Sequence, residues 1–216
     1  VSMRIIDSND ELRRNELIKK INKDLEDIIT NKDTTFRLTN LMILYNNMLQ
    51  SLFESQISTA GASIFILGIM FLILFKNIKM ALIALITNLI PISLVFGIMG
   101  WLKIPLDIMT ITIAAIALGI AVDDTIHFMH RFDFEYKQSH GNYKVAIIKA
   151  INTVGHPMYH MTIIVVIGFS ILMLSNLVPT IYFGLLTAVV MISVLIANLI
   201  LLPRLIFIFK PFKTKN

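Results

Sequence analysis

The 216-residue sequence has no cysteine and few charged residues. The absence of cysteine excludes a disulfide framework, a thiolate metal site and a cysteine nucleophile. Charged residues make up 15% of the chain and hydrophobic residues 56%. In soluble domains, charged residues average about 25% and apolar residues about 45–50%. Because a soluble domain cannot bury so much apolar surface, the sequence predicts an integral membrane protein.

The sequence also lacks signals for secretion and for common enzyme chemistry. It starts at Val1 without the basic and apolar regions of a signal peptide, so we expect it to be part of a longer polypeptide. It has no nucleophile elbow and no phosphate-binding loop. The histidine pairs 127/130 and 156/160 have no third metal ligand beside them. We therefore predict neither an enzyme nor a cofactor or metal site.

The net charge of +5 is unevenly distributed along the chain. Residues 1–55 hold 8 Lys and Arg against 9 Asp and Glu, while residues 56–216 hold 11 against 5. The basic excess thus lies in the hydrophobic part, which argues against a nucleic-acid partner.

Five apolar runs are long enough to cross a hydrocarbon layer of about 30 Å. The predicted spans are residues 57–75, 80–101, 106–129, 158–177 and 181–203. Ten Lys and Arg lie on one side of these spans and Lys103 alone on the other. Cytoplasmic loops are enriched in basic residues, so we expect the C-terminus in the cytoplasm and residues 1–55 outside the membrane.

Residues 1–55 carry the pattern of a small α+β piece. Met3–Ile6 and residues 34–39 are strand-like, and a helical apolar stripe follows the capping-box spacing of Ser8 and Glu11. A further helix from about Leu41 through Phe53 is predicted to run into the first span. Three elements offer too little core to fold alone.

The loop of residues 130–156 is too long for a simple turn. Residues 142–154 have the pattern of a short basic amphipathic helix, lying on the inner membrane surface or packed only on protein. Pro157 is expected in the first turn of the next span, where its missing N–H costs nothing. Residues 56–209 would form the transmembrane domain and residues 210–216 a basic cytoplasmic tail.

Asp123 and Asp124 carry the chemistry of the third span. Carboxylates within an apolar run are costly in a bilayer and by default mark an ion or proton pathway. Adjacent carboxylates repel each other and lose hydration, which lets them exchange protons near neutral pH. The alternative is that both residues reach the inner interface and are simply hydrated.

Ala115, Gly119, Asp123 and His127 recur at four-residue steps and so share one helical stripe. The small residues allow close approach of another helix, and Ala117 with Ala121 forms a second stripe leading toward Asp124. His127 is either a proton relay or an interfacial histidine.

Four isolated polar residues lie in the other spans. Each could either form a hydrogen bond to another helix or only fill space in the packing: Asn88, His160, Thr162 and Asn198.

The segment Gly119–His127, Gly-Ile-Ala-Val-Asp-Asp-Thr-Ile-His, resembles the GxxxDD-type signature of the resistance-nodulation-division (RND) superfamily. Its form is most similar to the MMPL and predicted-exporter branch, which is related to sterol-sensing domains. Further segments are similar to that branch: residues 44–52, 55–57, 154–157, 183–187 and 201–203. Asn198 departs from it, because related exporters often have an acid there.

The resemblance implies one half of a two-half transporter, most simply the C-terminal half, with residues 1–55 as the end of an extracytoplasmic porter domain. It assigns the proton relay to Asp123 and Asp124 and helix packing to Gly119. The shared helical stripe adds His127 to the candidate relay and Ala115 to the packing residues. It implies proton-driven export of hydrophobic or lipidic molecules at the bacterial inner membrane.

The partners implied are the other half of the transporter, the substrate and membrane lipids, with a homo-oligomer left open. The alternatives are a sterol-sensing-like lipid-responsive module and an accessory subunit of protein translocation.

Overall fold

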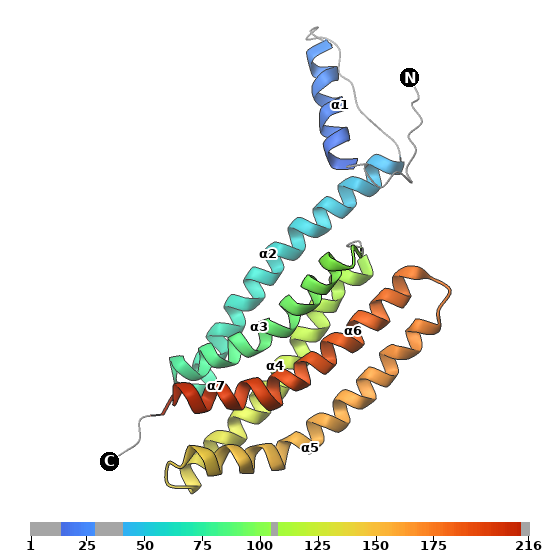
Figure 1. The fold of residues 1–216 in the computed structure, drawn as a ribbon. Coiled ribbons are helices and arrows are strands. Elements are labelled where there is room, and N and C mark those ends of the chain that lie inside the picture. The colour runs from blue at the N-terminus through green and yellow to red at the C-terminus, as the bar shows by residue number, and fades with distance from the viewer. Residues whose placement is uncertain (1–13, 29–40, 105–107, 213–216) are drawn as a thin grey trace. The chain divides into compact units, whose positions relative to one another are not determined.

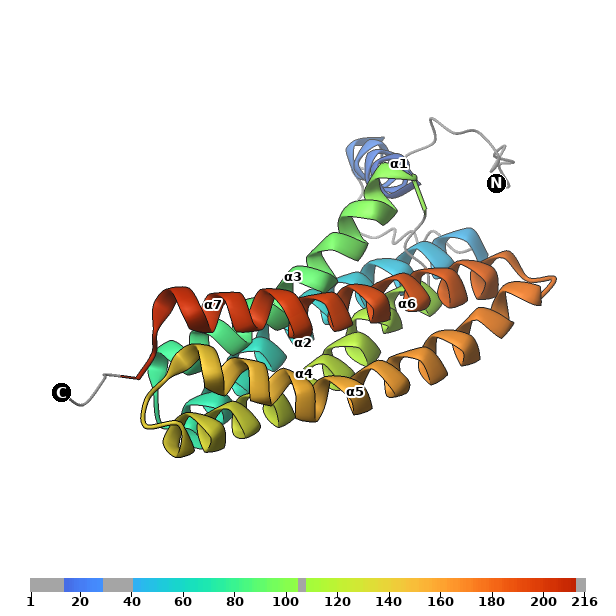
Figure 2. The same ribbon diagram turned by 60° about the horizontal axis from the view of Figure 1, so that its bottom comes forward.

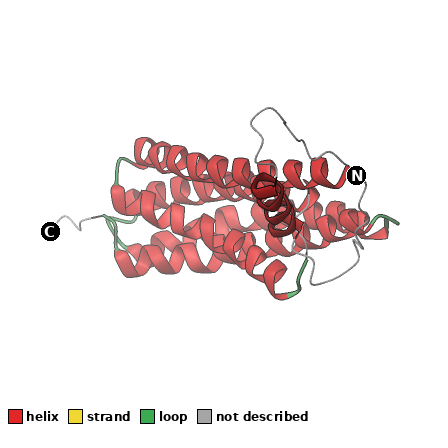
Figure 3. Ribbon diagram, turned by 90° about the horizontal axis from the view of Figure 1, so that it is seen from above, coloured by secondary structure: helices red, strands yellow, loops and turns green. Residues whose placement is uncertain are grey.

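The computed structural model describes residues 14–28, 41–104 and 108–212, and every element in these ranges is a helix (Figures 1 and 3). The predicted predominantly α fold is thereby confirmed. The predicted strands, Met3–Ile6 and residues 34–39, lie outside the described residues. The elements are α1 (Arg14–Ile28), α2 (Leu41–Phe75), α3 (Ile78–Trp101), α4 (Ile108–Gln138), α5 (Tyr143–Ser170), the 3₁₀ turn η1 (Ile171–Leu174), α6 (Val178–Ile196), the π-helical turn η2 (Ala197–Leu201) and α7 (Leu202–Phe209).

The chain divides into two compact units, residues 1–55 and 56–216. The first unit holds α1 and the first turns of α2. In α1 the predicted apolar stripe is present, with Ile18 buried and Leu17, Ile21 and Leu25 half-buried. The helix predicted from Leu41 does continue into the first apolar span, because no helix-breaking residue separates the two in α2.

In the part of the chain that the structure describes, five helical segments are long and apolar enough to cross a membrane, which is the predicted number of spans. They are Ile43–Phe75, Ile78–Trp101, Thr112–Gln138, Tyr143–Leu174 and Val178–Phe209. Their lengths of 24 to 33 residues exceed the ~20 residues needed to cross the hydrocarbon layer. The surplus turns form much of the connection between the third and fourth spans.

The predicted loop of residues 130–156 is almost entirely helical, and this corrects the sequence interpretation. Helix α4 continues to Gln138, and α5 begins at Tyr143, so that only a four-residue turn remains. The sequence looked polar here, yet Phe132, Tyr136 and Tyr143 are buried against one another. Burial of these rings stabilises the extra helical turns.

Pro157 is likewise not in a first turn, as predicted, but inside α5. Residues 142–154 are therefore not a separate amphipathic helix: α5 runs unbroken from Tyr143 through the proline to Ser170. A proline in a helix interior removes one backbone hydrogen bond. Spans tolerate this because neighbouring helices and hydroxyl side chains can satisfy the freed carbonyl.

Asparagine side chains begin two of the helices. Asn77 Oδ1 accepts hydrogen bonds from Lys79 N at 3.0 Å and Met80 N at 3.4 Å at the start of α3. Asn142 Oδ1 accepts from Val145 N at 3.3 Å at the start of α5. Both satisfy amide groups that a helix N-terminus leaves without partners.

One end of the bundle gathers the α2–α3 turn, the α4–α5 turn and residues 210–212; we call it the tail end (Figure 1). Asn77 Nδ2 donates to Pro211 O at 3.0 Å. The Tyr143 hydroxyl donates to Phe212 O and accepts from Phe212 N, both at 2.7 Å. These bonds hold the C-terminal residues against the starts of α3 and α5.

Within the second unit, α4 lies against α5 and α6, while α3 packs on α4, α6 and α7 (Figure 2). Gly184 permits the close crossing of α6 with the end of α5. A Cβ atom placed there would lie 2.6 Å from Phe169 O and 3.0 Å from Leu172 Cβ. Helix contacts of this kind require a small residue because the backbones approach so closely.

Candidate functional site: an acidic pair and a polar junction on α4

The two aspartates lie halfway along the 31-residue α4 and have opposite environments. Asp124 is 4% exposed within the bundle, whereas 57% of the Asp123 side chain is exposed. Consecutive residues in a helix point about 100° apart, so one carboxylate enters the bundle while the other lies on its surface. The structure therefore separates the pair that the sequence presents as a unit.

The predicted stripe of Ala115, Gly119, Asp123 and His127 lies on an uncovered face of α4. All four residues are exposed, and a Cβ added to Gly119 would meet no atom within 4 Å. His127 Nε2 lies 3.4 Å from Asp123 Oδ1, one helical turn away. The structure thus brings the exposed carboxylate and the imidazole together on a face that small residues leave open.

The second predicted stripe, Ala117 and Ala121, is fully buried, and Asp124 continues it one turn further along α4. Ala117 and Ala121 belong to an apolar cluster with Leu186 and Val190 of α6. The side of α4 that carries Asp124 is therefore the side on which the bundle closes.

Thr125 forms a polar junction between three segments, and sequence reasoning missed its role. Its fully buried Oγ1 lies 3.0 Å from Asn88 Oδ1 of α3 and 2.8 Å from Asn198 Oδ1 of η2. A hydroxyl has one hydrogen and donates to one of these oxygens at a time. We call these three residues the Thr125 junction.

The Thr125 junction also settles the two readings left open for the asparagines. Asn88 and Asn198 are 2% and 1% exposed. Each amide oxygen lies within hydrogen-bond distance of the Thr125 hydroxyl on another helix and accepts its hydrogen in turn, so neither residue merely fills space. Asn88 is further held by its own helix, since its Nδ2 donates to Ala84 O at 2.9 Å.

Asn198 lies in the π-helical turn η2, Ala197–Leu201, between α6 and α7. A π turn inserts an extra residue into a helix and frequently marks a functional site. Here it presents the Asn198 amide to α4 next to the acidic pair. The sequence carries no periodicity signal for such a turn.

A buried acid nearer the tail end was also missed. Glu135 of α4 is 4% exposed; its Oε1 lies 2.6 Å from Arg131 Nη2, and its Oε2 lies 3.6 Å from Lys149 Nζ of α5. The four-residue spacing of Arg131 and Glu135 is typical of a helical ion pair and could have indicated it. Lys149 makes the pair a link between α4 and α5.

The other histidine and threonine candidates take no part in this site. His160 is exposed, its Nδ1 lies 2.8 Å from His156 O of the same helix, and the two imidazole rings stack at 4.3 Å. Thr162 is buried on α5. Within the described ranges, no three His, Asp or Glu side chains cluster in a way that could hold a metal ion.

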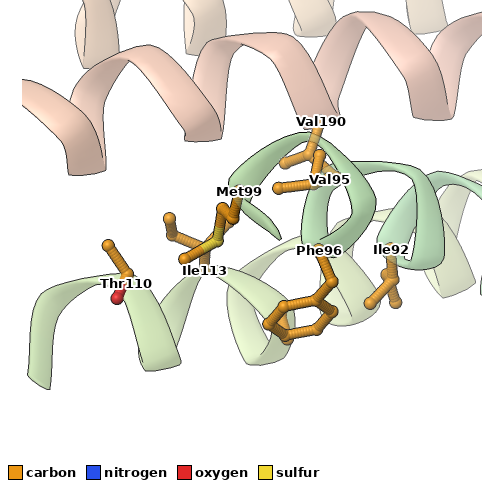
Figure 4. A pocket seen from close by; sticks show the side chains of 8 residues that line it. Ile92, Val95, Phe96, Met99, Thr110, Ile113 and Val190 are labelled. Atoms are coloured by element: carbon orange, nitrogen blue, oxygen red, sulfur yellow. The ribbon is translucent and has the colours of Figure 1, made fainter. Parts of the chain in front are cut away.

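Two hollows lie on or near α4. One, of about 400 Å³, is open and lined by His127, His130, Arg131, Phe134 and Val154, so it lies directly beside the Asp123–His127 pair. The other, of about 10 Å³, is lined by side chains of α3, α4 and α6 that are apolar except for Thr110 (Figure 4). The second has room for about one water molecule and is too small for a substrate.

Comparison with known proteins shows which family the chain belongs to. The model of the MMPL family matches residues 6–215, nearly the whole sequence. The chain belongs to the MMPL family. This family is a branch of the RND superfamily of membrane transporters, so the resemblance of residues 119–127 is confirmed.

One curated relative of this MMPL chain is a membrane protein of Methanocaldococcus jannaschii. The two are 33% identical over 159 residues, which cover 72% of this chain and 40% of the relative. The chain therefore spans less than half the length of the relative that it matches.

Proposed function

We propose that this MMPL chain forms the transmembrane part of one half of a proton-driven exporter of hydrophobic or lipidic molecules. The carrying observation is the division of the acidic pair between a buried carboxylate, Asp124, and an uncovered one, Asp123. An exposed carboxylate halfway along a span is costly in lipid and belongs against protein or water.

The occupant that we propose for the uncovered face is the other half of the same transporter. Small residues at Ala115 and Gly119 let a second helix approach closely. A chain that spans 40% of its curated relative is in accord with a two-half protein. In this arrangement Asp123 would lie between the halves, with His127 at 3.4 Å as its nearest proton partner.

Asp124 is proposed to couple protonation to helix movement through its neighbour Thr125. The charge of a buried carboxylate changes the energy of the surrounding packing. The residue that follows it ties α3 and η2 to α4. A change at Asp124 would therefore favour one arrangement of these segments over another, which is the requirement for a gated transporter.

The sidedness that we propose follows the basic residues of the sequence. The tail end, with Lys76, Lys79, Lys137 and Lys210, would face the cytoplasm, and residues 1–55 would lie outside the inner membrane. Protons would then enter from the outer side, pass the acidic pair and leave at the tail end.

The test uses the full-length transporter in vesicles that carry an imposed proton gradient. We expect Asp123→Asn and Asp124→Asn each to abolish gradient-dependent efflux of a fluorescent lipid analogue while leaving gradient-independent exchange intact. The matched control is Asp133→Asn on the same helix, because Asp133 pairs with Lys137 at 2.5 Å near the tail end and should transport normally. Efflux that survives both substitutions in the pair would refute the relay.

A further inference from the structure

A second feature of the bundle lies between helices that do not carry the acidic pair. Helices α2 and α3 follow each other in the chain and meet at a short turn (Figure 1). The turn consists of Lys76 and Asn77, and an open groove of about 380 Å³ lies between the two helices. Its volume falls within the range of about 300–1,000 Å³ that is usual for small-molecule sites. All its lining residues are apolar: Gly61, Ile64, Phe65, Gly68, Ile69 and Leu72 of α2, with Ile78, Ala81, Leu82 and Leu85 of α3.

The groove exists because α2 packs on the bundle mainly near its C-terminal end. Phe71 is fully buried there, whereas Phe65 is 70% exposed. Gly61 and Gly68 contribute no side chain, and an added Cβ at either would meet no atom within 4 Å. The missing side chains thus leave room along one stripe of α2.

The length of the groove matches one leaflet of a bilayer. Its lining extends from Gly61 to Leu72, which at 1.5 Å per residue is ~16 Å along the helix. Half of a hydrocarbon layer of about 30 Å is ~15 Å. An acyl chain of a single leaflet therefore fits the groove along its length.

Basic residues lie where the apolar lining ends. Lys76 directly follows the last residue of α2, and Lys79 lies in the first turn of α3, three residues before Leu82; both are exposed. The hydrogen bond from Asn77 Nδ2 to Pro211 O, at 3.0 Å, brings the exposed Lys210 to the same turn. Cations at this depth meet the headgroup region, where basic residues attract anionic lipids.

We propose that the α2–α3 groove binds one acyl chain of an anionic membrane phospholipid, whose phosphate lies against Lys76 and Lys79. The apolar lining recognises the chain and the lysines recognise the charge. This lipid is a resident of the groove, and the site does not depend on the proton relay.

The test is native mass spectrometry of the full-length transporter in detergent micelles. The micelles contain phosphatidylglycerol and phosphatidylcholine with the same acyl chains. We expect one phosphatidylglycerol to stay bound and phosphatidylcholine to be retained about tenfold less. The double variant Lys76→Gln/Lys79→Gln should lose that preference. Gly68→Leu should lose both lipids, because its side chain fills the groove.

Two matched controls separate this site from general effects. Lys103 has a left-handed backbone conformation like that of Lys76, with φ of 53° and 48°, respectively. Lys103 lies after the C-terminal end of α3, whereas Lys76 lies before its N-terminal end. Gly97 is an exposed glycine of α3 with equally open space around it and does not line the groove. Lys103→Gln and Gly97→Leu should therefore bind lipid as the unaltered protein does.

Three outcomes would overturn the proposal. The first is equal retention of both phospholipids by the unaltered protein. The second is unchanged retention in Gly68→Leu and in the lysine variant. The third is no retained lipid at all, as expected if another span of the full-length protein covers the groove.

Discussion

Replacing Thr125 by valine removes the hydroxyl that joins α3, α4 and η2 while keeping the shape of the side chain. The hydroxyl lies within 3.0 Å of both asparagine oxygens and is fully buried. Valine fills the same volume, so any loss of stability reports on the polar contacts rather than on a cavity.

The expected magnitude follows from these contacts. Interhelical hydrogen bonds in membrane proteins average about 0.6 kcal/mol each, and the substitution removes two polar contacts. It also leaves the Asn88 and Asn198 amides without their partner, and a buried unsatisfied group costs about 1–3 kcal/mol. We therefore expect Thr125→Val to lower the free energy of unfolding by roughly 1–3 kcal/mol.

The assay is equilibrium unfolding of the full-length protein in mixed micelles, with three variants compared. Thr125→Ser keeps the hydroxyl and should retain most of the junction. Thr112→Val is the control on the same helix, because the exposed Thr112 donates only to Met109 O of its own helix, at 2.7 Å. It should change stability by less than about 0.5 kcal/mol.

Equal destabilisation by Thr125→Val and Thr112→Val would refute the reasoning, because the interhelical contacts would then carry no more energy than an intrahelical one. A second check replaces the partners as well. With Asn88 and Asn198 both changed to leucine, Thr125→Val should cost much less, since no polar group is left unpaired.

Three further substitutions test the packing around the site. Asn77→Ala should cost about 1 kcal/mol in unfolding free energy through loss of a helix cap, and Asn77→Asp should recover the cap but not the bond to Pro211 O; equal stability of the two variants would contradict this. Gly184→Ala should destabilise by about 1–3 kcal/mol through overpacking, while Gly168→Ala, in open space on α5, should not, as thermal unfolding would register. Glu135→Gln should lower stability by about 1 kcal/mol, because its basic partners are partly exposed; unchanged unfolding would show that the link between α4 and α5 is not stabilising.

Much of the architecture could be predicted from hydrophobic pattern alone. Runs of about 20 apolar residues have few stable solutions other than membrane-spanning helices, so the five spans and the continuous helix from Leu41 were predictable. The predicted ends of α4 and α5 were wrong. Phe132, Tyr136 and Tyr143 lie in a polar stretch of sequence, and the stretch gives no sign that their rings cluster inside the bundle. The predicted position of Pro157 in a first turn was wrong for a related reason. Proline disfavours the interior of an isolated helix, but packing within the bundle offsets that preference in α5.

Part of the candidate site could likewise be predicted from the sequence, and part of it could not. The sequence by itself identified Asp123 and Asp124, because charge inside an apolar run needs no coordinates to be recognised, and helical spacing placed Ala115, Gly119 and His127 on one stripe with Asp123. Only the tertiary structure decided which carboxylate is buried, that Thr125 joins Asn88 and Asn198, and that Glu135 binds Lys149. Those contacts join residues 14 to 73 positions apart, and no local pattern encodes a distance that arises only when separate helices pack together.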